Sequence, residues 1–142
     1  MLKRFIILAG LSLLGSCSKE APTSVTVATI KAYSGRVTIT TEDPHGQQPA
    51  ETGQKLVEGH VVHTGEESRA TLIFEGGHEV DLGAQTSLVI KRHEIAAVHF
   101  GAVLLTGSAK ARTSANSSGP RLVIGTPLGI AELGATFSDV EF

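Results

Sequence analysis

The strongest constraint on the fold is a pair of glycines between two short alternating segments. Gly76 and Gly77 separate residues 71–75 from residues 78–82, and in both segments apolar side chains occupy every second position. A two-residue turn between antiparallel strands needs positive φ angles, which glycine adopts without steric cost. We therefore predict that residues 71–82 form a β-hairpin with one buried face.

The same alternation recurs along much of the chain, at residues 25–29, 37–40, 88–91 and 131–137. Apart from residues 5–14, apolar side chains nowhere recur at three- and four-residue spacings over the length of an ordinary amphipathic helix. Glycine is abundant, at 16 residues, and the apolar side chains are mainly Val, Ile, Leu and Ala in short runs. This composition is typical of β structure with many turns, so we predict an all-β fold.

Two segments are predicted to be irregular loops. Residues 42–53 contain two prolines and two glycines and keep no hydrophobic period. The segment near residues 106–120 consists largely of Ser, Ala, Gly, Asn and Thr, together with Lys110 and Arg112. Because such a segment buries little apolar surface to offset the entropy of ordering, we predict that it is a mobile loop.

The first residues predict export. Lys3 and Arg4 precede the apolar residues 5–14, and the small residues Gly15 and Ser16 follow. A membrane-spanning helix needs roughly 20 apolar residues, so this shorter stretch is not expected to remain as a span. The arrangement is typical of a secretory signal peptide, which we assign to residues 1–16.

The end of this segment resembles the lipobox of bacterial prolipoproteins, with the sequence Leu14-Gly15-Ser16-Cys17. The resemblance implies cleavage between Ser16 and Cys17 and lipidation of Cys17, with several acyl chains holding the product on a membrane. Cys17 is the single cysteine of the chain, and lipidation explains an unpaired thiol in an exported protein. An ordinary signal peptide with a chance cysteine is the alternative.

After residue 16 we predict a lipidated N-terminus and short tether over residues 17–24 and one β domain over residues 25–142. Those 126 residues suit a single domain with a workable core. Ser18 is not the aspartate that retains enterobacterial lipoproteins at the inner membrane. By that analogy we expect the outer membrane.

Glycines, threonines and alternate apolar residues in the domain together resemble the FecR domain. The matching motifs are Leu56-x-x-Gly59, Val62-x-Thr64-Gly65, Ser68-x-Ala70-x-Leu72-x-Phe74, Gly77-x-x-Val80-x-Leu82, Thr86-x-Leu88 and Thr126-Pro127-x-Gly129-x-Ala131. The resemblance spans about residues 33–140 and implies a twisted β-solenoid-like stack of short strands with glycine-rich turns. It implies a role in the fold, not in catalysis, for Gly59, Thr64, Gly65, Ala70, Phe74, Gly77, Leu82, Thr126, Pro127 and Gly129.

Members of that family that regulate sigma factors place a cytoplasmic helical segment and a membrane span before this domain. Here the lipobox stands in that place. We therefore expect that this chain does not pass a signal inward by itself.

The histidines do not have the spacing of a metal site. His60 and His63 are the closest pair of the six, but residues three apart on a strand face opposite sides. With no further cysteine as ligand, a closed zinc site would need distant histidines to converge. We predict surface or hairpin histidines, no metal and no cofactor.

The carboxylates are expected at turns or on outward faces of strands, as solvated charges: Glu66, Glu67, Glu75, Glu79 and Asp81. No Gly-x-Ser-x-Gly nucleophile motif occurs. We therefore predict that the protein is not an enzyme.

The charge and the aromatic content disfavour two classes of ligand. Residues 1–16 contain two of the twelve basic residues and none of the fourteen acidic ones, which leaves ten against fourteen and disfavours nucleic acid. After residue 16 the aromatic residues are one Tyr and four Phe, too few for a broad sugar-stacking platform.

Together these features predict a lipid-anchored, non-enzymatic cell-envelope protein that binds or scaffolds another envelope component. The first alternative is a sensory accessory module that docks on a transporter or a transmembrane regulator. The second is a peptidoglycan- or carbohydrate-binding protein.

Overall fold

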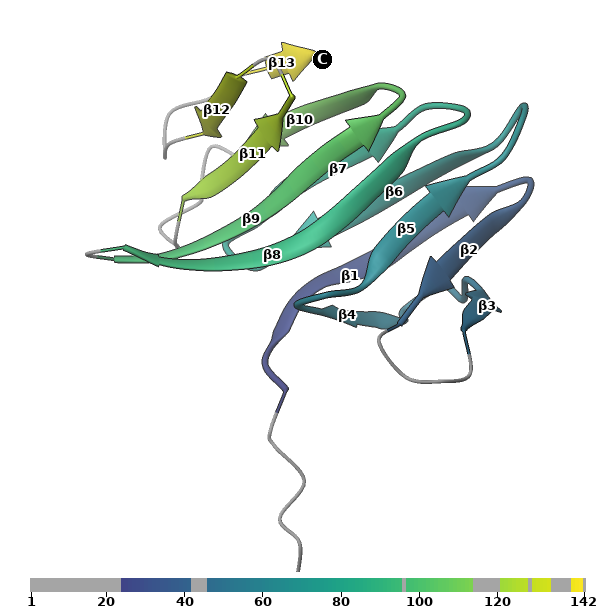
Figure 1. Cartoon of the computed structure of the whole chain (residues 1–142), viewed down its shortest axis with the longest axis horizontal. Coiled ribbons are helices and arrows are strands. Elements are labelled where there is room, and N and C mark those ends of the chain that lie inside the picture. Colours follow the sequence, from purple (N-terminus) through teal and green to yellow (C-terminus); the bar gives the residue numbers. More distant parts are fainter. Residues whose placement is uncertain are drawn as a thin grey trace, which may run out of the picture.

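The protein is described by a computed structural model. The structure describes residues 24–41, 46–95, 97–113, 121–127, 129–133 and 139–141. These residues form strands and no helix, which confirms the predicted all-β class for this part of the chain (Figure 1). Within the same ranges, no helix is long and apolar enough to cross a membrane.

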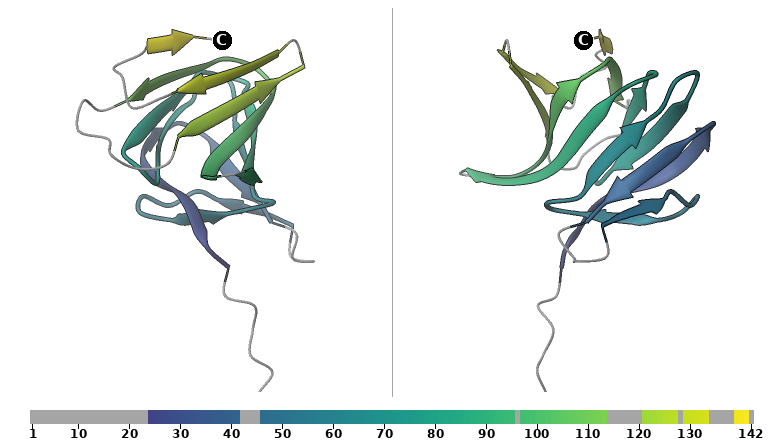
Figure 2. Two further views of the ribbon diagram at one scale, coloured as in Figure 1. Left: turned by 90° about the vertical axis from the view of Figure 1, so that its left-hand side faces the viewer. Right: turned by 45° about the vertical axis from the view of Figure 1, so that its right-hand side comes forward.

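The strands form two sheets, which we call the back sheet and the front sheet after their positions in Figure 1. The back sheet has six strands in the order β13 (Asp139–Glu141), β10 (Ala109–Thr113), β7 (His78–Leu82), β6 (Arg69–Phe74), β1 (Thr26–Ser34) and β4 (Lys55–Val57). The front sheet has seven strands in the order β12 (Gly129–Leu133), β11 (Leu122–Thr126), β9 (Ala97–Thr106), β8 (Ser87–Ile95), β5 (Val61–Thr64), β2 (Val37–Thr40) and β3 (Gln47–Pro49). Figure 2 shows the two sheets from other sides as facing layers.

Besides the crossings on either side of β4, the described chain passes between the sheets at four tight corners, which join β1 to β2, β5 to β6, β7 to β8 and β9 to β10. Each of these strand pairs is in effect one long strand bent across both sheets. The paired strands are antiparallel, except that β11 runs parallel to β9. The described part is thus an antiparallel meander folded along its corners.

The predicted solenoid-like stack is not confirmed. A solenoid winds successive coils in one rotational sense, whereas this chain reverses direction at the β6–β7 hairpin and again at the β8–β9 hairpin. Short strands with glycine-rich turns are present as expected, but they are arranged as a bent meander.

One apolar core lies between the sheets, because alternate residues of each strand point inward. In β6 the predicted inner residues Ala70, Leu72 and Phe74 are at most 2 % exposed, while Ile73 between them is 38 % exposed. The described core residues are Val27, Ala28, Ile30, Val37, Ile39, Ala50, Leu56, Val62, Ala70, Leu72, Phe74, Val80, Leu82, Leu88, Ile90, Ala102, Leu104, Ala109, Ala111, Leu122 and Ile124.

The hairpin predicted at the glycine pair is confirmed, with one correction to its turn. Gly76 and Gly77 have φ angles of 95° and 84°. The last paired residues are Phe74 and His78, so the turn has three residues and includes Glu75. One more residue in the turn leaves the alternation of both strands unchanged.

The predicted mobile loop near residues 106–120 is wrong for Ala109–Thr113, which form β10 between β7 and β13. Its inward residues Ala109, Ala111 and Thr113 are buried. Because these side chains are small, the sequence suggested that the segment buries too little apolar surface to become ordered. Hydrogen bonds to the neighbouring strands on both sides also order it. Residues 114–120 lie outside the described residues.

The other predicted loop is also partly wrong. Within residues 42–53, Gln47–Pro49 form the edge strand β3 on β2. Proline is tolerated there because an edge strand has one side free of ladder hydrogen bonds.

Candidate functional site

The four corners lie side by side along one end of the molecule, in the upper right of Figure 1, and we call them the corner ridge. It comprises residues 34–36, 65–68, 83–86 and 107–108. Backbone hydrogen bonds link each corner to the next: the Gly65 amide donates to the Arg36 carbonyl at 2.9 Å and the Gln85 amide to the Gly65 carbonyl at 3.0 Å. The Gly83 amide donates to the carbonyl of Ser108 at 2.9 Å. The ridge is therefore one continuous hydrogen-bonded structure.

Buried hydroxyl groups reinforce these links. The Ser68 hydroxyl accepts from the Arg36 amide at 2.9 Å, and the Thr86 hydroxyl accepts from the Ser108 amide at 3.1 Å. The Thr64 hydroxyl donates to the Gly83 carbonyl at 2.6 Å. Since Thr64, Ser68 and Thr86 are 6 %, 1 % and 1 % exposed, their hydroxyls act as fixed internal partners for the corner backbone.

Two corners repeat one local design. Residues 65–68 and residues 83–86 both read Gly-x-x-Ser/Thr, and their third residues, Glu67 and Gln85, both have a φ of 51°. Positive φ is uncommon for residues other than glycine. The hydrogen-bonded hydroxyl that follows each of them holds this conformation in place.

A short glycine corner packs against each of these repeated corners. A Cβ at Gly35 would lie 2.4 Å from Ser68 Oγ, and one at Gly107 would lie 2.2 Å from Thr86 Oγ1. Both glycines also have positive φ, 79° and 91°. Glycine is thus required at these two positions by close approach as well as by backbone conformation.

The fold-motif residues predicted from the sequence lie in different parts of the structure. Thr64 and Gly65 belong to the corner ridge, whereas Gly59 and Gly77 occupy turns with φ angles of 91° and 84°. Ala70, Phe74 and Leu82 are core residues, at 2 %, 0 % and 2 % exposed, and Thr126, Pro127 and Gly129 lie at the β11–β12 turn, where Thr126 pairs with Gly129.

The predicted cleavage and lipidation residues, Ser16 and Cys17, lie outside the described residues. The described chain enters β1 at the end opposite the corner ridge (Figure 1). Because β1 has nine residues, this entry and the ridge are about 27 Å apart.

The outer face of the back sheet carries a charged network across four strands. Lys31 Nζ lies 3.0 Å from Glu79 Oε2, and Arg112 Nη2 lies 3.3 Å from Glu79 Oε1. Arg112 also pairs with Asp81, whose other carboxylate oxygen accepts from the Thr71 hydroxyl at 2.7 Å. The predicted solvated carboxylates Glu79 and Asp81 are therefore partners of β1, β6 and β10 side chains.

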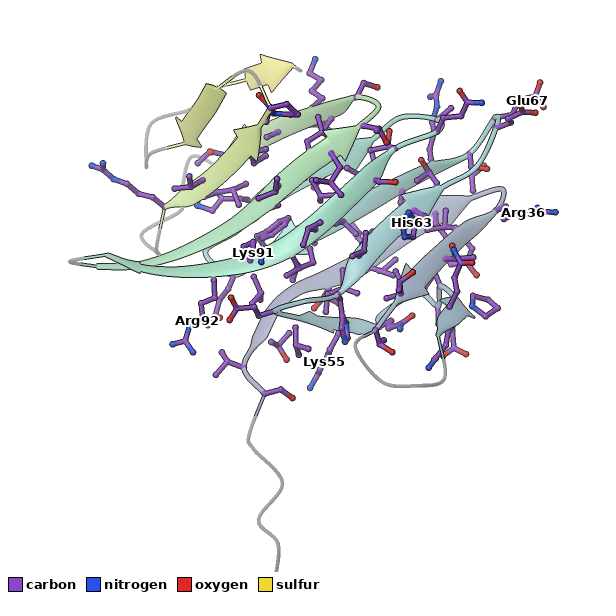
Figure 3. All side chains as sticks on the ribbon, in the orientation of Figure 1. Arg36, Lys55, His63, Glu67, Lys91 and Arg92 are labelled. Carbon is purple, nitrogen blue, oxygen red and sulfur yellow. The ribbon has the colours of Figure 1, made fainter. Side chains whose placement is uncertain are left out.

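The outer face of the front sheet carries His63, labelled in Figure 3. Its Nδ1 lies 2.9 Å from Ser87 Oγ and its Nε2 lies 3.1 Å from Thr40 Oγ1. A serine–histidine pair acts as a nucleophile when a carboxylate orients the histidine, and here a threonine hydroxyl occupies that place. The arrangement therefore ties three strands together and does not form a catalytic triad.

His78 lies in the back sheet, apart from His63. His78 belongs to the β6–β7 hairpin as predicted, but it is 1 % exposed and its Nδ1 lies 3.1 Å from Thr113 Oγ1. Among the residues that the structure describes, no three His, Cys, Asp or Glu side chains are grouped in a way that could hold a metal ion.

A hollow lies where the corner ridge meets the outer face of the back sheet. This groove has a volume of about 800 Å³. Its polar lining consists of Ser34, Glu67, Ser68, Arg69, Asp81, Ser108 and Lys110. The groove could not be predicted from the sequence, because its lining comes from segments that are far apart along the chain and share no motif.

The fold and these sites define an all-β domain made of a bent antiparallel meander with hydroxyl-linked glycine corners. A family model described as FecR protein matches residues 60–141, more than half of the chain. The chain therefore belongs to the FecR protein family, which is associated with signalling regulators. Neither the curated proteins nor the solved structures contain a significant match.

Proposed function

We propose that this protein is a lipid-anchored, non-enzymatic component of the bacterial cell envelope whose FecR domain binds or scaffolds another envelope component. The observation that carries this proposal is the lipobox-like sequence ending in Cys17, placed after a short apolar run and before a FecR domain. The acyl chains on Cys17 would provide the membrane contact. Ser18 at the next position favours the outer membrane.

The geometry of the domain supports a tethered binding module. Seven residues, 18–24, separate Cys17 from Val25 and can extend by at most about 25 Å. The tether joins the end of β1 that is remote from the corner ridge (Figure 1). A lipid on Cys17 would thus keep the domain near the membrane and leave the ridge directed away from it.

The anchoring is tested by mass spectrometry of the protein purified from membranes of its source cell. We expect a mature N-terminus at Cys17 whose mass includes a diacylglyceryl group and an amide-linked acyl chain. In Cys17→Ala the acyl mass should disappear, whereas Ser18→Ala, a matched change one residue further on, should keep it. Recovery of wild-type protein with an intact leader, or with an unmodified Cys17, would refute the anchoring.

A sensory accessory role is the second candidate, favoured by the association of the family with signalling regulators. In this role the domain docks on a transporter or on a transmembrane regulator. Crosslinking in intact cells, followed by capture from solubilised membranes, should then recover such a protein. Recovery of envelope proteins of other classes only would leave the scaffold role and exclude this one.

A further inference from the structure

The β8–β9 hairpin extends beyond the strands that flank it in the front sheet. Within the described residues, β5 pairs with β8 only as far as Val89, and β11 pairs with β9 only from Phe100 onward. The outer part of the hairpin, residues 91–95 and 97–99, is therefore a two-stranded arm, which projects at the left of Figure 1.

The strand register places two histidines directly opposite each other in this arm. His93 of β8 pairs with His99 of β9, and the register is regular from Leu88 to Ile95. Residues directly opposite in an antiparallel pair belong to the same face of the sheet, with Cβ atoms about 4.5–5.5 Å apart. The two histidines are six residues apart in the sequence, and the hairpin brings them to adjacent positions.

Two imidazoles at this spacing suit one divalent transition-metal ion. Zinc binds histidine nitrogens at about 2.0–2.1 Å, so two nitrogens on one tetrahedral ion lie about 3.3 Å apart. Side chains that start from neighbouring positions on one face can meet this requirement. Imidazole nitrogen suits zinc, copper and nickel, whereas carboxylate and water oxygens suit magnesium and calcium. The pair therefore selects for the first group of metals.

The neighbouring pair on the same face determines how strongly an ion is held. Lys91, labelled in Figure 3, precedes His93 by two residues, and Gly101, directly opposite Lys91, contributes no side chain. An ammonium group near the ion repels it, which lowers the affinity. Two protein ligands beside one cation therefore indicate a site that exchanges its metal, unlike a closed structural zinc site with four ligands.

We propose that His93 and His99 together bind one zinc ion on the β8–β9 arm. The ion would link the two strands of the arm, and its remaining positions would be open to water or to a ligand from a bound partner. This inference goes beyond the proposed function, since the site lies within the FecR domain and does not depend on a lipid at Cys17.

The test is isothermal titration calorimetry with zinc chloride. It uses the full mature chain, purified from membranes in detergent without a histidine tag. We expect saturable binding of one zinc ion per chain. Magnesium chloride, a hard cation that prefers oxygen ligands, is the control titrant and should give no saturable binding at the same concentrations.

His93→Gln and His99→Gln should each weaken zinc binding at least about tenfold, because each removes one of two protein ligands. His63→Gln is the matched control, since both ring nitrogens of His63 already lie within hydrogen-bond distance of hydroxyl groups. It should change the affinity less than twofold. Circular dichroism before each titration verifies that the variants retain the fold.

Lys91→Gln keeps both ligands and removes the nearby positive charge. It should tighten zinc binding about twofold at physiological salt, and less at high salt. A role of the histidines in the fold alone predicts no such gain, so this variant tests the position of the ion independently of the histidine substitutions.

Zinc binding that is absent, that persists unchanged in His93→Gln and His99→Gln, or that falls as far in His63→Gln would overturn the site. Equal binding of magnesium would overturn it too, because that result indicates oxygen ligands. These outcomes are separate from the anchoring: if the mass of Cys17 shows no lipid, the anchoring fails whatever the zinc titration gives.

Discussion

The outer faces of the two sheets are stabilised differently. The back sheet carries a chain of charges from Lys31 through Glu79 to Arg112. The front sheet carries a row of valines, in which Val61 pairs with Val89 and Val89 with Val103. The outer face of the back sheet is therefore stabilised by ion pairs between strands, and that of the front sheet by apolar cross-strand pairs.

The largest expected loss of stability comes from a substitution in the core that the two sheets share. Phe74→Ala should reduce the free energy of unfolding by about 3–5 kcal/mol, because Phe74 is fully buried between the sheets. Ile73→Ala, the adjacent residue on the exposed face, should cost less than about 1 kcal/mol. Urea denaturation measures both. Similar losses for the two variants would show that the sheets do not share one core.

The next largest loss of stability is expected from a substitution in the corner ridge, where the chain passes from one sheet to the other. Gly107→Ala should destabilise the fold by about 3 kcal/mol, since its φ is 91° and its Cβ would meet Thr86 at 2.2 Å. Gly53→Ala is the matched control, with a φ of 83° and open space around it. It should cost only about 1 kcal/mol. If the two variants unfold at the same urea concentration, close approach at the ridge has no energetic role.

A smaller effect is expected from one hydroxyl of the ridge. Thr86→Val keeps the shape of the side chain but removes the acceptor of the Ser108 amide, and should cost about 2 kcal/mol. Thr86→Ser keeps the hydroxyl and should recover most of this loss. Thermal unfolding of the pair distinguishes a hydrogen-bonding role from a packing role, because in a packing role serine would be the worse substitution.

The smallest effect tests the contrast between the faces directly. Arg112→Met should cost about 0.5–1 kcal/mol at low salt, because the ion pairs of Arg112 are partly exposed to solvent. At 1 M NaCl the difference from wild type should nearly vanish. Val89→Ala on the front sheet should cost a similar amount that salt does not change. A salt-independent loss in Arg112→Met would contradict the electrostatic account of the back sheet.

The sequence predicted the structure best where one local signal determined it. The Gly76-Gly77 pair and the alternation on both sides predicted β6 and β7 within one residue at the turn. The resemblance to the FecR domain also pointed to a role in the fold for Thr64 and Gly65, which lie side by side at one of the corners. In each case conformation depends on residues that are neighbours in the chain.

The sequence failed where order depends on distant partners. The segment Ala109–Thr113 reads as polar loop, and it becomes a strand through pairing with β7 and through the ion pairs of Arg112 with Glu79 and Asp81. Those partners lie 33 and 31 residues away. The groove was missed for the same reason, because Arg69 and Lys110 line one hollow only when β6, β7 and β10 pair.

The stacked corners have a consequence for motion. The amides of Gly65, Gly83, Gln85 and Ser108 each donate to an acceptor in an adjacent corner. A proton on one of them can exchange with solvent only when two corners separate, so exchange at these four sites should be slow and should accelerate together on destabilisation. The turns of this protein, usually the first parts of a β domain to fray, would then open as a single cooperative unit.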